Sequence, residues 1–279
     1  MSQPNETAPA EAAARAAALK IARTFVGARQ GATSLPEFPG PIPPDMASGY
    51  AIQEQAIGLW PDSVVGWKVG LVPPPEQAQL GTVRLSGPIF RRNVIHVGSG
   101  PIHLPAIAGG FAAIEVELVA AAGVDARPDK TQRTLEEAAA LVGAWYLGVE
   151  FAASPFAGIN DLGATVVISD FGNNSGLVIG SRLDSALLAD PAQLVCRATI
   201  ESKEVGWANA AALPGGPLEA LRFLLGHLAA RGRPLRAGQW VSTGAVTGVH
   251  RIFPGQKATA ELMGRERIEV SIATATAAA

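Results

Sequence analysis

Two patterns of hydrophobic and polar positions divide the chain. Over residues 9–29, apolar side chains alternate with charged ones at helical spacing, and residues 45–59 show a second helical pattern. From Val64 onward the chain changes to short apolar runs broken by Gly and Pro, which are typical of strands. The sequence therefore predicts an α+β protein. We expect an N-terminal helical segment over residues 1–62 and a β-rich catalytic domain over residues 63–279.

Two further helices are expected within the β-rich part. The sequence Thr134-Leu135-Glu136-Glu137 fits a capping box, and apolar positions at helical spacing then continue through Val142 and Trp145. Pro217 opens a helix that runs to about Ala230. The late strands are predicted as a hairpin over 194–200 and 204–208, followed by strands at 239–243, 257–263 and 267–273.

Composition narrows the class of protein. The 279 residues include 22 Lys and Arg against 24 Asp and Glu, so the net charge is −2, and 16% of positions are charged. This balance excludes a strongly basic nucleic-acid binder and a polyacidic disordered chain. The one cysteine, Cys196, excludes an intrachain disulfide, and with four histidines it argues against a Cys/His zinc site. No convincing membrane-spanning stretch is present, so we expect a cytoplasmic protein that binds no membrane.

A few charges stand alone in long apolar runs, where burying an unpaired charge is costly. These charges are Lys68 in Gly66-Trp67-Lys68-Val69-Gly70, Glu115 and Glu117 in one run, Glu150 in Gly148-Val149-Glu150, and Asp170 before a Gly/Asn cluster. They are the candidates for chemistry.

Glu115 and Glu117 are two positions apart in a β-prone run, so their side chains point to the same face of a strand. One interpretation is a half-exposed strand with both carboxylates in water. Glu150, a third carboxylate in an equally apolar setting, favours a site instead. Three carboxylates without a nearby His or Cys suit Mg²⁺ or Mn²⁺, whose open coordination positions would accept water and substrate.

The basic candidates each have two interpretations. Lys68 is either a surface lysine in a turn or a lysine in a dry site beside a cation, where its pKa would be lowered. Arg91 and Arg92 are either a solvated pair or bidentate ligands of a substrate carboxylate. Asp170 either belongs to a turn or serves the reaction.

In their order along the chain, these stretches resemble the fumarylacetoacetate hydrolase superfamily. Within it they are most similar to the 2-keto-4-pentenoate hydratase and 4-oxalocrotonate decarboxylase branch. The resemblance covers roughly residues 15–272. It rests on Tyr50-Ala51-Ile52-Gln53, Gly66 to Leu71, Glu115-Val116-Glu117, Gly148-Val149-Glu150, Asp170 to Gly180 and Ser242 to Gly248.

The resemblance implies a mixed β roll or barrel-like body preceded by helices, often assembled into homo-oligomers. It implies that Glu115, Glu117 and Glu150 bind one divalent metal and that Lys68 is catalytic. The C–C bond hydrolases of the family usually carry a His on a lid between the lysine and the metal pair. No histidine occurs between Lys68 and Ile95 here, which argues against that reaction.

One segment departs from the hydratases. After the Gly-Pro that precedes the metal pair they tend to carry an acidic pair, whereas this chain reads Gly87-Pro88-Ile89-Phe90-Arg91-Arg92-Asn93. The change favours either a substrate with an additional anionic group or a surface role for the arginines.

The resemblance implies a divalent-metal-dependent lyase that adds water to a 2-hydroxy-2,4-dienoic acid, in catabolism of aromatic-derived acids. The alternatives are a 4-oxalocrotonate-type 2-oxo acid decarboxylase and then an acylpyruvate-type hydrolase. A non-catalytic subunit is disfavoured because a dead site has no physical reason to keep costly charges in apolar runs. We expect Lys68 to act as general acid/base or enol-orienting group, with Asp170, Ser242 and Thr243 as weaker candidates for placing water or substrate.

Overall fold

The structure is a computed structural model that describes residues 7–98 and 100–277. The α-helices are α1 (Thr7–Gln30), α2 (Met46–Leu59), α3 (Pro74–Leu80), α4 (Leu135–Ala139), α5 (Ala164–Ser169) and α6 (Gly216–Ala230). The strands are β1 (Val64–Leu71), β2 (Arg84–Phe90), β3 (Val94–His96), β4 (His103–Ala106), β5 (Phe111–Ala122), β6 (Val142–Ser154), β7 (Asn174–Leu183), β8 (Val195–Ile200), β9 (Lys203–Asn209), β10 (Trp240–Ser242), β11 (His250–Arg251), β12 (Lys257–Leu262) and β13 (Glu266–Thr274).

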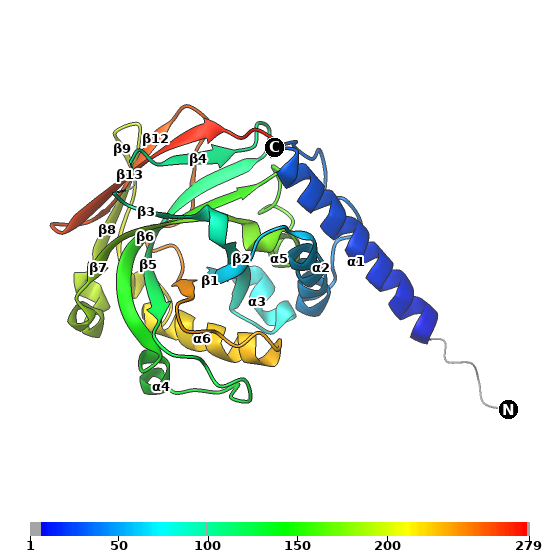
Figure 1. The fold of residues 1–279 in the computed structure, drawn as a ribbon, viewed down its shortest axis with the longest axis horizontal. Coiled ribbons are helices and arrows are strands. Elements are labelled where there is room, and N and C mark those ends of the chain that lie inside the picture. Colours follow the sequence, from blue (N-terminus) through cyan, green and yellow to red (C-terminus); the bar gives the residue numbers. More distant parts are fainter. Residues whose placement is uncertain (1–6, 99, 278–279) are drawn as a thin grey trace.

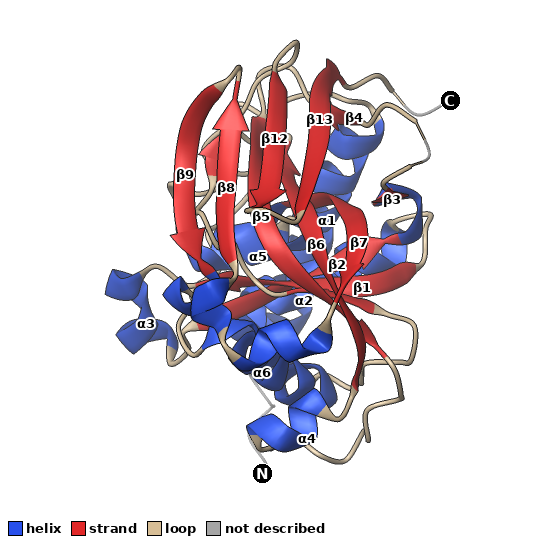
Figure 2. Cartoon of the chain, turned by 90° about the vertical axis from the view of Figure 1, so that its left-hand side faces the viewer, coloured by secondary structure: helices blue, strands red, loops and turns tan. Residues whose placement is uncertain are grey.

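The strands form two sheets. The larger sheet has the order β2-β1-β10-β5-β6-β7-β3, with β11 also paired to β5, and it curls into a half-barrel (Figure 1). The smaller sheet has the order β4-β13-β12-β8-β9 and stands beside the larger one (Figure 2). The predicted α+β architecture, with helices first and a mixed, mostly β body after them, is confirmed.

The central strand β5 is buried on both of its faces. Ile114, Val116 and Leu118 belong to the main core, which also takes in the smaller sheet and the leucines of α6. Ala113 points the other way, into the cluster formed by the N-terminal helices. Glu115 and Glu117 alternate with the main-core residues, so they share the face of Ala113. The interpretation in which they face water is therefore wrong.

The N-terminal helices close the inner face of the larger sheet. Phe25 of α1 and Ile52 of α2 pack in one cluster with Phe90 and Phe171, and burying each such side chain contributes roughly 1.5–3 kcal/mol. Asp45 caps α2, because its side chain accepts a hydrogen bond from the Ser48 N–H at 2.8 Å. The first turns of α1 extend beyond the body (Figure 1).

One helix is much shorter than the sequence predicts. The capping box at Thr134 is present, with both of its hydrogen bonds, yet α4 ends at Ala139. Val142 and Trp145 lie on β6 instead, where they pair with β5. Their apolar spacing fits a helix as well as a strand, and long-range pairing with β5 decides in favour of the strand.

Two short helices are not predicted by the sequence pattern. In α5 the β-prone sequence Ala164-Thr-Val-Val-Ile-Ser169 is helical, because its apolar side chains pack against α2. Gly49 of α2 permits this approach, since a Cβ there would meet the Thr165 carbonyl oxygen at 3.0 Å. The other short helix is α3. The predicted C-terminal hairpin, the long helix α6 and the last strands are confirmed. None of the described helices combines the length and apolarity needed to cross a membrane.

Candidate metal centre and active-site cavity

Three buried carboxylates meet on the inner face of the larger sheet. Register places Glu115 of β5 directly opposite Glu150 of β6, and Glu117 lies two positions along β5 on the same face. One oxygen from each side chain lies within 4.8 Å of the others. The exposed fractions are 5% for Glu115 and 0% for both Glu117 and Glu150. Among the described residues this is the group of acidic, histidine or cysteine side chains placed to share one metal ion.

The electrostatics of the triad fit a cation. Burial raises the pKa of Glu115 to about 7. Burial, together with the charges of Glu150 and Glu115, raises the pKa of Glu117 well above its ordinary value. Glu117 Oε1 and Glu150 Oε2 are buried without a hydrogen-bond partner, which is costly for a carboxylate oxygen. Oxygen donors of this kind suit a hard divalent cation, which would neutralise their repulsion and bind the two unpartnered atoms.

Neighbouring groups orient the carboxylates. Glu117 Oε2 accepts a hydrogen bond from the Ser242 hydroxyl and another from the Gly244 N–H at 2.9 Å. Glu150 Oε1 accepts one from Asn174 Nδ2 at 3.1 Å. Each of these two glutamates therefore has one oxygen engaged by the protein and the other without a hydrogen-bond partner. Hydrogen bonds of this kind, made to the ligand side chains by neighbouring groups, hold the ligands of a metal site in position.

Lys68 lies beside the triad. It comes from β1 and is 4% exposed, and its Nζ is 3.3 Å from Glu150 Oε1. Burial by itself lowers the pKa of an ammonium group, but the charges of Glu150, Glu115 and Glu117 outweigh it and raise the pKa of Lys68 above its ordinary value. The lowered pKa expected from the sequence supposes a cation beside the lysine, whereas the three carboxylates alone shift the pKa upward.

A cavity of about 430 Å³ opens over Lys68 and Glu115. Its polar lining also includes Asn160 and Asn173, whereas its wall is formed by small and apolar residues. These are Gly70, Leu71, Pro73, Leu85, Gly163, Ala164, Val167, Gly244, Ala245, Gly248 and Val249. The cavity thus combines a charged lysine and carboxylate with an apolar wall.

A larger hollow of about 660 Å³ lies on the smaller sheet. It includes no member of the triad, and charged side chains that pair with one another, such as Arg197 with Glu261, line it. We place the chemistry in the smaller cavity, because Lys68 and one member of the triad, Glu115, line it.

The other predicted site residues have different surroundings. Asp170 is fully buried but bound to Arg29, with Nε to Oδ1 at 2.6 Å, and it does not line the cavity. Thr243, which follows β10, donates to the Leu118 carbonyl of β5 at 2.6 Å. Ser242 reaches the site through Glu117, as described above.

Arg91 and Arg92 are exposed and lie outside the lining of the cavity. Arg91 Nε donates to Ser63 Oγ at 3.0 Å, and the Arg92 N–H donates to Asp62 Oδ2 at 2.8 Å. This geometry corresponds to the surface interpretation of the pair and offers no contact with a substrate in the cavity.

Three asparagines and one arginine near the site were not predicted from the sequence. Asn173 and Asn174 follow Asp170 in a run whose composition also fits a turn. The sequence signal that could have identified them is that these two adjacent polar residues stand between two apolar segments. Asn160 and Arg29 carry no local signal, because their partners are distant in the sequence: Arg29 and Asp170 are 141 positions apart.

No family model matches the chain, and no curated protein matches it. Solved structures do share its fold. The 4-oxalocrotonate decarboxylase from Pseudomonas putida G7, complexed with magnesium and adipate, superposes with a TM-score of 0.74 at 20% sequence identity, covering 92% of this chain and 98% of that one.

Two others are more distant. Fumarylpyruvate hydrolase from Pseudomonas aeruginosa, in complex with Mn²⁺ and pyruvate, has a TM-score of 0.55 at 17% identity and covers 75% of this chain and 89% of its own. For 5-carboxymethyl-2-hydroxymuconate delta-isomerase from Mycobacterium smegmatis the TM-score is 0.54 at 16% identity, with coverage of 77% and 81%. The chain thus has the fold of the fumarylacetoacetate hydrolase superfamily.

Proposed function

We propose that this protein is a divalent-metal-dependent lyase that adds water to a 2-hydroxy-2,4-dienoic acid. The observation that carries the proposal is the buried triad of Glu115, Glu117 and Glu150 beside the ammonium group of Lys68, at the polar end of a cavity with an apolar wall. The three glutamates would hold Mg²⁺ or Mn²⁺. Structural neighbours that contain magnesium and an acid, or manganese and pyruvate, support a metal and a small acid as ligands.

Each group has a distinct task in this proposal. A divalent cation held by the three glutamates would supply Lewis-acid stabilisation of the negative charge that develops on the substrate. Lys68, which lies beside the triad and lines the cavity, is placed to move the proton of the 2-hydroxyl to the terminal carbon of the diene, which gives the conjugated 2-oxo acid. Water then adds to the far alkene carbon of this 2-oxo acid, and Lys68 moves the proton that the water loses to the carbon next to the 2-oxo group. Asn160 and Asn173 can orient the water by hydrogen bonds.

The cavity favours a substrate with one carboxylate. Among the described residues that line it, Lys68 is the one cation, and Glu150 already pairs with it. A second carboxylate would meet apolar side chains such as Val167 and Val249, where desolvating it is costly. The apolar wall therefore supports the dienoic acid over a 2-oxo diacid.

Decarboxylation of a 2-oxo acid is the second candidate, because it uses the same stabilised enolate. Its support is the decarboxylase fold that covers 92% of this chain. Hydrolysis of an acylpyruvate ranks third, since no histidine lies between Lys68 and Ile95.

A spectrophotometric screen of 2-hydroxydienoic acids with Mg²⁺ or Mn²⁺ tests the proposal. Loss of the conjugated chromophore without release of CO₂ is expected, whereas CO₂ in equal amount would show decarboxylation. We expect Lys68→Met to lower kcat by roughly 100- to 10,000-fold, because proton transfer is lost. The matched control is Lys257→Met, which changes an exposed lysine. Full activity of Lys68→Met would remove that residue from the mechanism.

A further inference from the structure

The segment that leads from α5 into β7 has an unusual backbone. Three residues in succession, Phe171, Gly172 and Asn173, are left-handed, with φ angles of 56°, 63° and 56°. This conformation is unfavourable for a residue with a Cβ, and it persists only where the surroundings hold it. A fully buried phenylalanine in such a turn therefore needs an anchor.

The anchor is Arg29, in the last turn of α1. Its Nε donates to Asp170 Oδ1 at 2.6 Å, and its Nη2 donates to Asp170 Oδ2 at 2.9 Å. The guanidinium group therefore binds the carboxylate in a bidentate manner, with two hydrogen bonds. Nη2 also donates to the Ala153 carbonyl at 2.7 Å, and the guanidinium lies 5.3 Å from the Phe171 ring centre. Both charged side chains are buried, at 7% and 0% exposure.

The left-handed turn packs directly against the strands that present Lys68. A Cβ at Gly172 would lie 3.4 Å from Lys68 Cδ and 3.0 Å from Gly87 Cα, and a Cβ at Gly87 would lie 2.0 Å from the Phe171 carbonyl oxygen. Gly87 is the β2 partner of Lys68 in the sheet. The turn thus forms one wall of the channel that holds the lysine side chain.

The same segment brings two amides to the site. Asn173 Oδ1 lies 3.5 Å from Lys68 Nζ, and its Nδ2 donates to Asn160 Oδ1 at 3.2 Å. Asn174 Nδ2 donates to Glu150 Oε1. A shift of the turn would therefore move the neighbours of both the lysine and one carboxylate.

We infer that Arg29 is a positioning residue: through its buried ion pair with Asp170 it holds the turn over residues 171–173 against Lys68 and so fixes the ammonium group and Asn173 in the cavity. Asp170 is then an anchor and not a catalytic base, because both of its carboxylate oxygens are engaged by Arg29. The inference rests on the proposed role of Lys68 in the reaction.

The kinetic test compares Arg29→Met and Arg29→Lys with Arg197→Met, which breaks an ion pair in the smaller sheet. For Arg29→Met we expect kcat to fall roughly 10- to 100-fold, because a small misplacement of a reacting group has this effect. KM should change by less than about threefold, since the groups that bind the acid remain. Arg29→Lys should recover part of kcat, and the control should keep it.

A second measurement needs no turnover. Metal-free protein is treated with acetic anhydride, and acetylation of each lysine is followed by mass spectrometry. Lys68 should react several times faster in Arg29→Met than in the unmodified protein, measured against the exposed Lys203 and Lys257. If the unmodified protein converts no dienoic acid, the proposed function fails, whereas this labelling still tests the positioning of Lys68.

Arg29→Met leaves a carboxylate buried without a partner and risks failing to fold. The double variant Arg29→Met/Asp170→Asn removes both charges, and we expect from it the same loss of kcat and the same gain in Lys68 labelling. A folded variant with kcat and Lys68 labelling equal to those of Arg197→Met would overturn the inference. So would an Arg29→Lys variant no more active than Arg29→Met.

Discussion

At the scale of single residues, the site brings four buried charged side chains together. Lys68, Glu115, Glu117 and Glu150 were all identifiable in the sequence, because a charge inside an apolar run is costly to bury unless a partner or an ion compensates it. Their proximity agrees with that interpretation. For Asp170, Arg91 and Arg92 the sequence could not distinguish a site role from a structural one. A charged residue in a turn, in a buried ion pair or on the surface has the same kind of sequence neighbours.

The raised pKa of Glu115 predicts an unusual pH dependence. Burial lifts this pKa to about 7 from the ordinary 4.5, so the folded metal-free protein keeps a proton that the unfolded chain has released. Its contribution to stability is present below pH 4.5 and is lost as pH rises through about 7. We expect the Tm of the metal-free protein to fall over this range.

Protons and cations compete for the same oxygens, so added Mn²⁺ should raise Tm more at pH 8 than at pH 5. Glu115→Gln should lose most of this response, and Glu269→Gln, at an exposed glutamate, should keep it. Thermal melts with and without the ion measure both effects. An equal Mn²⁺ response in Glu115→Gln would contradict the metal assignment.

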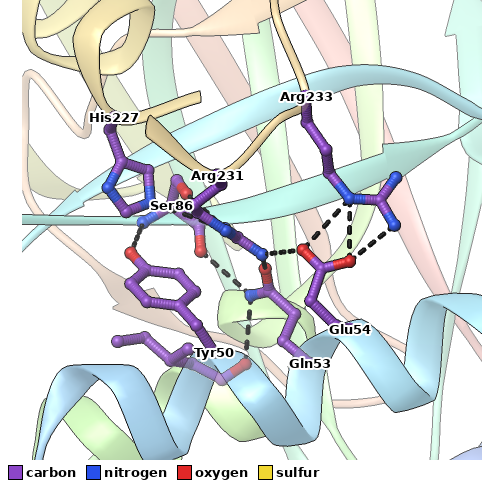
Figure 3. A network of polar contacts seen from close by, with 8 residues as sticks. Tyr50, Gln53, Glu54, Ser86, His227, Arg231 and Arg233 are labelled. Atoms are coloured by element: carbon purple, nitrogen blue, oxygen red, sulfur yellow. Dashed lines mark hydrogen bonds and ion pairs between the residues drawn. The ribbon is translucent and has the colours of Figure 1, made fainter. Parts of the chain in front are cut away.

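At the scale of elements, a polar network joins α2, β2 and α6 (Figure 3). Gln53, which is fully buried, donates to the carbonyls of Ser86 at 3.0 Å and Ile168 at 3.1 Å. Its own oxygen accepts from Arg231 at 3.0 Å, and Arg231 also pairs with Glu54. One side chain thus satisfies groups from three elements around the strand pair that carries the lysine.

Gln53→Met should lower the free energy of unfolding by about 2–4 kcal/mol, because two buried carbonyls and a guanidinium nitrogen lose a partner. Gln55→Met makes the same change on the same helix at a half-buried position and serves as the control. Urea denaturation measures both. A loss no larger than that of the control would mean that water replaces the amide.

His227 on α6 predicts a second, opposite pH effect. Burial and the nearby Arg231 lower its pKa to about 4 from 6.5, so the folded state holds it neutral. Its contribution is present above pH 6.5 and is lost as pH falls through about 4, at most about 3 kcal/mol. His227→Phe should flatten this part of the stability profile, and His103→Phe, at an exposed histidine, should not. If His227→Phe loses stability at low pH as the unmodified protein does, this histidine is not the cause of that loss.

Helices and strands were predicted correctly where the apolar positions followed one clear period, either helical or strand-like. The helices α1, α2 and α6 and the hairpin of β8 and β9 follow their patterns to within a few residues. Prediction failed at α4, because apolar positions up to Trp145 fit both periods, and at α5, because tertiary contact with α2 overrides the strand preference of Val166 and Val167.

At the scale of the whole molecule, the chain leaves apolar surface at an outer strand. Trp207 lies on β9, the last strand of the smaller sheet, and is 60% exposed; Phe253 is 55% exposed. Exposed strand edges and large apolar side chains are usually covered in a stable protein. They are consistent with the predicted homo-oligomer, which stays a prediction.

Light scattering on the purified protein tests this assembly. We expect a mass that is a multiple of 28.7 kDa, unchanged on removal of metal by chelation, because the triad is buried inside one chain. Trp207→Glu should shift the mass toward that of one chain if β9 contributes to the contact. A mass of 28.7 kDa for the unmodified protein at every concentration would exclude the assembly.

The pairing of Glu115 with Glu150 has a consequence for how the protein matures. The two residues face each other only when β5 and β6 align in one register, because a slip of one position turns a strand's side chains to the opposite face. A misaligned hairpin therefore has no ion-binding trio. We expect ion uptake during refolding to follow correct strand alignment, and an ion bound by the three glutamates would then select against the slipped sheet.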